Sequence, residues 1–140
     1  MKNVLYLCLL FAVFSCNKNE KKEVVIIENK VVKQSEMAAL MLKMYDKGLE
    51  NKKLVIEGKT PENFPEEFLN IHTAKLTDPS DRTKNFKTFS DFYLNSFKEI
   101  YNTSKDSLVI NHNNAINSCI ACHETTCVGP IPRIKKLLIK

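Results

Sequence analysis

The sequence lacks several patterns that would place it in a common class. It has no stretch of about 20 consecutive apolar residues, the length that a membrane-spanning helix needs; the apolar run Val4–Phe14 is too short. No convincing alternation of apolar and polar residues marks a β-strand in the part of the chain beyond residue 34. No internal repeat is visible either. Since the chain has 140 residues, we expect one domain built from helices.

The sequence also lacks the strong positive charge of a typical nucleic-acid-binding protein. Twenty-one Lys and Arg residues against 16 Asp and Glu residues give a formal net charge of +5. No motif interleaves aromatic and basic residues. An excess of this size affects solubility and docking, so we expect no nucleic-acid partner.

The N-terminus has the features of an export signal. Lys2 precedes the apolar run Val4–Phe14, and the small residue Ser15 follows it, which predicts a signal peptide over residues 1–15. Residues 13–16 resemble a bacterial lipobox, which predicts cleavage before Cys16 and lipidation of its thiol. Residues 16–34 then form a lipidated cysteine and tether. We therefore expect a periplasmic protein attached to a bacterial membrane by its lipid.

Two thiols near the C-terminus carry the most informative motif. Cys119 and Cys122 lie three residues apart, and His123 follows directly. This is the attachment signature of a c-type haem, in which both thiols form thioethers and the imidazole is the proximal iron ligand. The sequence therefore predicts one covalent haem c, held by a haem-binding domain over residues 35–140. Haem attachment takes place outside the cytoplasm, which agrees with the export signal.

Two rival interpretations of this cluster are weaker. With Cys127 added, three thiols and one imidazole could ligate zinc. However, Cys122 and His123 are adjacent, and neighbouring residues on a helix point about 100° apart. A thioredoxin-like redox pair needs a strand before it, which the sequence lacks. Cys127 itself is predicted to be buried rather than paired between molecules, because Val128 and an Ile-rich segment follow it.

Helical periodicity divides the haem-binding domain into four helices. Caps, prolines and apolar spacing predict helices over residues 35–57, 65–74, 78–102 and 107–124, and a basic turn over 133–138. The fold class predicted is all-α, an antiparallel four-helix bundle enclosing the haem near the C-terminal helix. An apolar face on the third helix should form core: Phe86, Phe89, Phe92, Tyr93, Phe97, Ile100 and Tyr101.

The residue on the far side of the iron is less well defined. His112 lies eleven residues before His123 on one predicted helix, roughly 16 Å away, so it cannot bind the same iron. His72 is a second candidate, although a lone histidine is more often an exposed or hydrogen-bonded side chain. The first helix presents methionines on one face, either as a thioether ligand or as flexible core.

These residues resemble a known family, the class II cytochromes c, or cytochrome c-prime group. A closer resemblance, over residues 35–138, is to small exported bacterial monohaem proteins with a Ser-Glu-x-Ala-x-Leu-Met helix and a Cys-x-x-Cys-His-x-x-x-Cys-x-Gly-Pro-Ile-Pro-Arg-Ile ending. The resemblance implies that Met41 is the distal ligand, with Met44 as second choice. It also implies that Cys127 belongs to the haem environment. Class II proteins often dimerise through their first two helices, which by analogy implies a homodimer.

The function expected from these features is electron transfer through the haem iron. The protein is then a carrier that exchanges electrons with redox proteins that the sequence does not identify, and it is not an enzyme. The alternative is a sensor or scavenger of nitric oxide or carbon monoxide, which needs five-coordinate iron. The sixth ligand decides between them.

Overall fold

The computed structural model describes residues 34–140. The predicted signal peptide over residues 1–15, the lipidated Cys16 and all of the tether except Gln34 lie outside the described residues. Those predictions therefore stay predictions.

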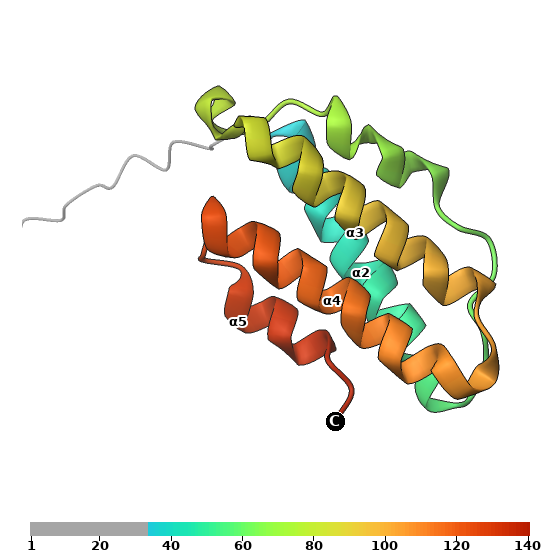
Figure 1. Ribbon diagram of the computed structural model, residues 1–140. Coiled ribbons are helices and arrows are strands. Elements are labelled where there is room, and N and C mark those ends of the chain that lie inside the picture. The colour runs from blue at the N-terminus through green and yellow to red at the C-terminus, as the bar shows by residue number, and fades with distance from the viewer. Residues whose placement is uncertain (1–33) are drawn as a thin grey trace, which may run out of the picture. The chain divides into compact units, whose positions relative to one another are not determined.

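The described residues form helices and no strand, which confirms the all-α prediction (Figure 1). Three of the helices are long. In chain order the elements are α2 (Glu36–Ile56), η1 (Glu66–His72), η2 (Pro79–Asp81), α3 (Lys84–Asn102), η3 (Lys105–Ser107), α4 (Leu108–Thr125), α5 (Ile131–Ile134) and η4 (Lys135–Leu137), where η marks a 3-10 helix. Within residues 34–140, no helix combines the length and the apolar character needed to cross a membrane.

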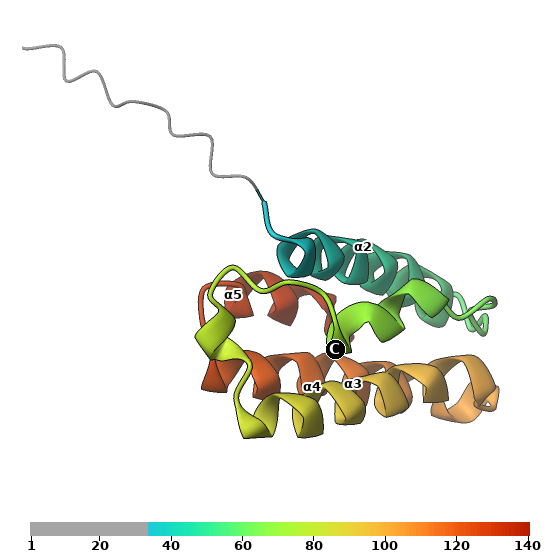
Figure 2. The ribbon, with the colours of Figure 1, turned by 90° about the horizontal axis from the view of Figure 1, so that it is seen from above.

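The long helices lie in two layers. Helices α3 and α4 pack side by side as an antiparallel pair, and α2 lies behind them, running in the same direction as α3 (Figures 1 and 2). The short η1 returns the chain between α2 and α3 along one edge of the pair. Helix α5 lies along the opposite edge, beside α4. The chain direction thus reverses at each of the connections α2–η1, η1–α3 and α3–α4.

The limits of α2 follow from its caps. The side-chain oxygen of Ser35 accepts a hydrogen bond from the backbone N–H of Ala38 at 3.1 Å, which satisfies a free donor of the first turn. At the other end Gly58 has φ +69°, a left-handed conformation that glycine adopts without strain. The predicted helix over residues 35–57 is confirmed to within one residue.

The start of α3 differs from the prediction. Asp78 does cap a helical turn, accepting from the backbone N–H of Ser80 at 2.9 Å, but this turn is the separate 3-10 helix η2. The backbone then leaves the helical conformation at Arg82, with φ −79° and ψ 65°, and α3 begins only at Lys84. The side chain of Arg82 donates to two carbonyl groups of the preceding segment and lies over the Phe86 ring of α3. A cap and a proline thus started one turn, not the long helix.

The other two predicted helices differ less. The segment over residues 65–74 forms the 3-10 helix η1 rather than an α-helix, while the helix over 107–124 is confirmed as α4 with one residue's shift. The turn predicted over 133–138 starts earlier, at Ile131, because Pro132 occupies the first turn of α5.

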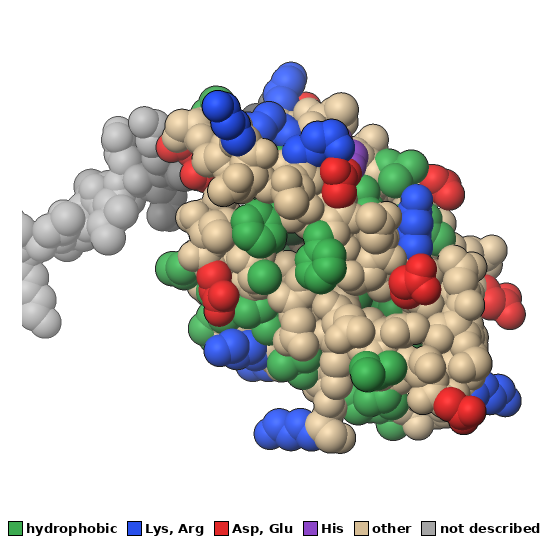
Figure 3. Space-filling view, viewed as in Figure 1, with side chains coloured by type: hydrophobic (Ala, Val, Ile, Leu, Met, Phe, Trp, Pro, Cys, Tyr) green, Lys and Arg blue, Asp and Glu red, His purple; other side chains and the backbone are tan. Residues whose placement is uncertain are grey.

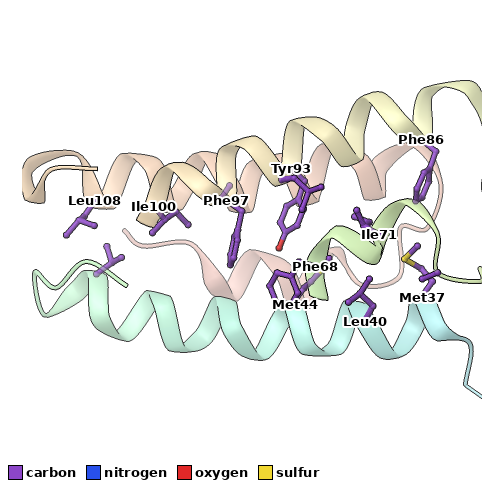
Figure 4. Packing of buried hydrophobic residues seen from close by; sticks show 14 residues of the cluster. Met37, Leu40, Met44, Phe68, Ile71, Phe86, Tyr93, Phe97, Ile100 and Leu108 are labelled. Carbon is purple, nitrogen blue, oxygen red and sulfur yellow. The ribbon is translucent and has the colours of Figure 1, made fainter. Parts of the chain in front are cut away.

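The core is formed mainly where α2 faces α3. Phe97 is 1 % exposed and its ring contacts the rings of Phe64, Phe68, Tyr93 and Tyr101, with centroids 5.4 to 6.2 Å apart. Figure 4 shows side chains of α2 pointing toward those of α3, with Phe68 and Ile71 of η1 beside them. The predicted aromatic face of α3 is therefore largely core.

Phe92 is the exception on that aromatic face. It is 55 % exposed, so its assignment to the core is wrong. It directly precedes the buried Tyr93, and adjacent residues on a helix point about 100° apart, which turns Phe92 outward. On the face seen in Figure 3, apolar side chains lie in separate groups among polar ones.

The last residues of the chain form a strap, defined as residues 130–139, that docks on α2 and α4. Lys52 donates hydrogen bonds to the carbonyl oxygens of Lys136 and Leu138, both at 2.8 Å. Asn113 bonds both the N–H and the carbonyl oxygen of Ile139 at 2.9 Å. A Cβ atom at Gly48 would lie 3.0 Å from a methyl group of Leu137, so a larger residue there would require the Leu137 side chain to shift.

Candidate functional site

A cavity of about 590 Å³ lies among α2, α3, the end of α4 and the strap. This volume is in the usual range for a small-molecule or cofactor site. Its wall is mostly apolar, with aromatic rings contributed by α3. The aromatic lining residues are Tyr45, Phe86, Phe89, Tyr93 and Phe97. An apolar wall of this kind suits a ligand that is apolar over most of its surface.

The two thiols of the predicted motif lie at this cavity. Cys119 and Cys122 both line it from the last turns of α4. The Cys119 thiol donates a hydrogen bond to the carbonyl oxygen of Ala115 at 3.3 Å. Burial raises the pKa of Cys119 to about 12, and burial also raises the pKa of Cys122. Both thiols are therefore protonated at neutral pH, which is unlike the low-pKa thiolate of a redox-active pair.

His123 lines the same cavity and its ring is oriented by the chain that follows α4. Its Nδ1 atom lies 2.8 Å from the carbonyl oxygen of Cys127. A carbonyl can only accept, so Nδ1 carries the proton and the lone pair of the neutral imidazole is on Nε2. Histidines that bind metals usually donate their other N–H in this way. If a metal binds at Nε2, this hydrogen bond would orient the ring.

The donor set can be tested against a covalent haem. Two thiols and one imidazole whose Nδ1 is bonded to a carbonyl oxygen line a single, mostly apolar cavity. Within residues 34–140 no group of three or more His, Cys, Asp or Glu side chains could hold a metal ion by itself. A haem needs only one protein imidazole for its iron, so these residues fit a haem.

The candidate distal ligands are on α2. Met41 is half-buried and Met44 is buried, and both line the cavity. Met37, one turn earlier, lines it too. Figure 4 shows Met37 and Met44 on the side of α2 that faces α3. The structure therefore brings the first and second choices to the same cavity as His123.

The remaining histidines are engaged elsewhere. His72 is not among the residues that line the cavity; its ring nitrogens lie 3.2 Å from the hydroxyl of Ser90 and 3.3 Å from a carboxylate oxygen of Asp91. His112 is fully buried, and its Nε2 donates to the carbonyl oxygen of Leu137 at 2.9 Å. His112 thus holds the strap, a role that the sequence did not suggest.

Cys127 is exposed, so the prediction that it is buried is wrong. It lies in the non-helical turn between α4 and α5, followed by Val128, which is 64 % exposed. Its backbone carbonyl, not its thiol, faces His123. The residue nevertheless lines the edge of the cavity.

The strap supplies one wall of the site that was missed from the sequence. Ile134 and Leu137 line the cavity and pack with Ile116 of α4. The apolar residues Ile131, Ile134 and Leu137 recur every three residues, as on one face of a short helix. That spacing could have indicated from the sequence that the strap packs on the domain.

Neither a model of a known protein family, nor a curated protein, nor a solved structure matches this chain. The resemblance to class II cytochromes c therefore stays a prediction. The interpretation of the cavity depends on its own residues.

Proposed function

We propose that this chain is a monohaem c-type cytochrome that transfers electrons through its haem iron. One observation carries the proposal: both thiols of the Cys-x-x-Cys-His motif and the imidazole that follows them line one apolar cavity. The hydrogen bond from His123 Nδ1 to the Cys127 carbonyl oxygen also supports the proposal, because it leaves the Nε2 lone pair free to bind a metal.

Each part of the site then has a definite task. Cys119 and Cys122 would hold the haem by thioether bonds, each formed by adding the S–H of a thiol across one vinyl group. His123 would bind the iron, and Met41 or Met44 would supply the second axial ligand from α2. When bound, the haem supplies one-electron redox chemistry. The aromatic wall would exclude water from the ring.

We further propose that the molecule works as a four-segment bundle anchored outside the cytoplasm. Helices α2, α3 and α4 with the short η1 would be the four segments. The signal peptide over residues 1–15 and a lipid on Cys16 would place the protein in the periplasm on a bacterial membrane. Electron-carrying proteins at that membrane would be its partners.

The experiment is to produce the chain in a bacterium with a working c-type maturation system and to measure its mass and its pyridine haemochrome spectrum. We expect one covalent haem in the wild type and none after both Cys119→Ala and Cys122→Ala. The matched control is Cys127→Ala, which removes a third thiol from the same cavity and should keep the haem. A wild-type mass without haem would refute the proposal.

The second axial ligand is tested with the same protein. A methionine ligand predicts a low-spin reduced spectrum that carbon monoxide does not change. Met41→Leu should then give a high-spin spectrum that carbon monoxide shifts, while Met44→Leu should not. If the wild type already behaves as five-coordinate iron, the gas-binding alternative replaces electron transfer.

A further inference from the structure

The chain has two arginines, and they differ in the hydrogen bonds that their side chains form. Arg82 donates to the carbonyl oxygens of His72 and Ala74 at 2.6 and 2.5 Å, so its guanidinium is satisfied by backbone. Arg133 takes part in none of the ion pairs or side-chain hydrogen bonds formed within residues 34–140. Its planar fork of N–H donors is therefore available to a ligand.

Arg133 also lies at the cavity. It is the one Lys or Arg side chain among the described residues that line it. Asp81 is the one Asp or Glu among them, and it forms no ion pair with Arg133. A mostly apolar cavity with a single free cation suits a ligand that is apolar over most of its surface and carries an acid group at one edge.

The guanidinium of the exposed Arg133 is restrained by one contact. Its central carbon lies 4.0 Å from the centre of the Tyr45 ring, a cation–π contact that uses one face and leaves the N–H edge open. Arg133 belongs to α5, in the strap that Lys52, His112 and Asn113 fix to α2 and α4. Less side-chain freedom is therefore lost when a carboxylate binds.

We propose that Arg133 is a positioning residue that binds a carboxylate of the cavity's ligand. This inference rests on the proposed function: for a haem, the carboxylate is a propionate. Arg133 would then hold that carboxylate, and its positive charge would favour the reduced form of the bound group. A guanidinium can bind a carboxylate with two parallel hydrogen bonds, which a lysine cannot reproduce.

The test compares mature holo-proteins with the same change of charge in the same segment. Arg133→Gln should lower the midpoint reduction potential and shift the propionate bending band in the resonance Raman spectrum. Arg133→Lys keeps the positive charge, so its midpoint potential should fall less than that of Arg133→Gln. Its propionate bending band should still shift, because a lysine cannot form the two parallel hydrogen bonds. Lys135 begins η4, the next helix of the strap, and does not line the cavity. Lys135→Gln should therefore change neither the midpoint potential nor the propionate band.

A second measurement uses the full chain without haem and two probes, protoporphyrin IX and its dimethyl ester. The wild type should bind the free acid roughly tenfold more tightly than the ester, because charge-assisted hydrogen bonds are the stronger ones. Arg133→Gln should lose this preference, and Lys135→Gln should keep it. Equal binding of acid and ester by the wild type would overturn the inference.

The two hypotheses fail in different ways. A wild-type protein without covalent haem would refute the proposed function and this inference together. A wild type with haem, in which Arg133→Gln behaves as Lys135→Gln does, would refute the role of Arg133 alone.

Discussion

Acid should destabilise the strap through His112. This imidazole is fully buried, its Nε2 donates to the carbonyl oxygen of Leu137, and its Nδ1 has no hydrogen-bond partner within residues 34–140. Burial lowers the pKa of His112 below its usual value; the Leu137 carbonyl opposes this and the nearby Lys52 ammonium adds to it. Protonation of Nδ1 would create a buried charge that no acceptor neutralises.

The sign of the effect follows from proton binding. As pH falls below about 6.5, the imidazole of the unfolded chain takes up a proton that the folded chain does not bind. The free energy of unfolding therefore decreases, by at most about 1.4 kcal/mol per pH unit, until the lowered pKa of the folded state is reached. At pH 7.5 both states are neutral at this site and the contribution is absent.

The assay is urea unfolding of wild type and His112→Gln at several values between pH 7.5 and pH 5.5. The variant has no titratable group at this position and its absolute stability also changes, so the pH dependence, not the absolute stability, is compared. Between pH 6.5 and pH 5.5 the wild type should lose up to about 1 kcal/mol more than the variant, because the unfolded imidazole is only partly protonated at the start of this range. Acid-sensitive carboxylates such as Asp91 are common to both proteins. Equal losses in the two would refute the reasoning.

Three further substitutions test the packing, each by urea unfolding. Phe97→Ala should cost about 3 to 5 kcal/mol, because it empties the centre of the aromatic core. Ser35→Ala should cost about 1 kcal/mol by removing the acceptor for the N–H of Ala38. Gly48→Ile should cost about 1 to 3 kcal/mol, since its Cβ would already press on Leu137.

Each of these has a matched control. Phe92→Ala removes a ring from the same helix, but that ring is 55 % exposed, so the loss should be small. Ser107→Ala changes the N-cap of α4, where the side chain makes no capping bond. Gly129→Ile adds a side chain where nothing lies within 4 Å. A control that costs as much as its partner would contradict the corresponding assignment.

Local chemistry made part of this fold predictable. Ser35 and Gly58 define α2 because a cap and a left-handed glycine act within a few residues. The same local logic failed at Asp78, where the cap was real but the helix ended after one turn. Arg82 diverts the backbone there by bonding to carbonyl groups eight and ten residues earlier.

The motif at Cys119 needed no tertiary information, whereas the wall opposite it did. His112, Asn113 and Lys52 bond to backbone atoms 25 to 86 residues away, and a backbone carbonyl gives no signal in the sequence. Cys127 was misjudged for a related reason. Its apolar neighbours suggested burial, but the turn uses its carbonyl oxygen to orient His123 and leaves Cys127 exposed at the cavity.

The docking of the strap has a consequence for access to the two thiols. Residues of the strap complete one wall around Cys119 and Cys122. That wall is open whenever the strap is undocked, so the thiols are most accessible to a modifying enzyme before the strap folds onto α2 and α4. A substitution that weakens the docking of the strap, such as one at Asn113, should prolong that window.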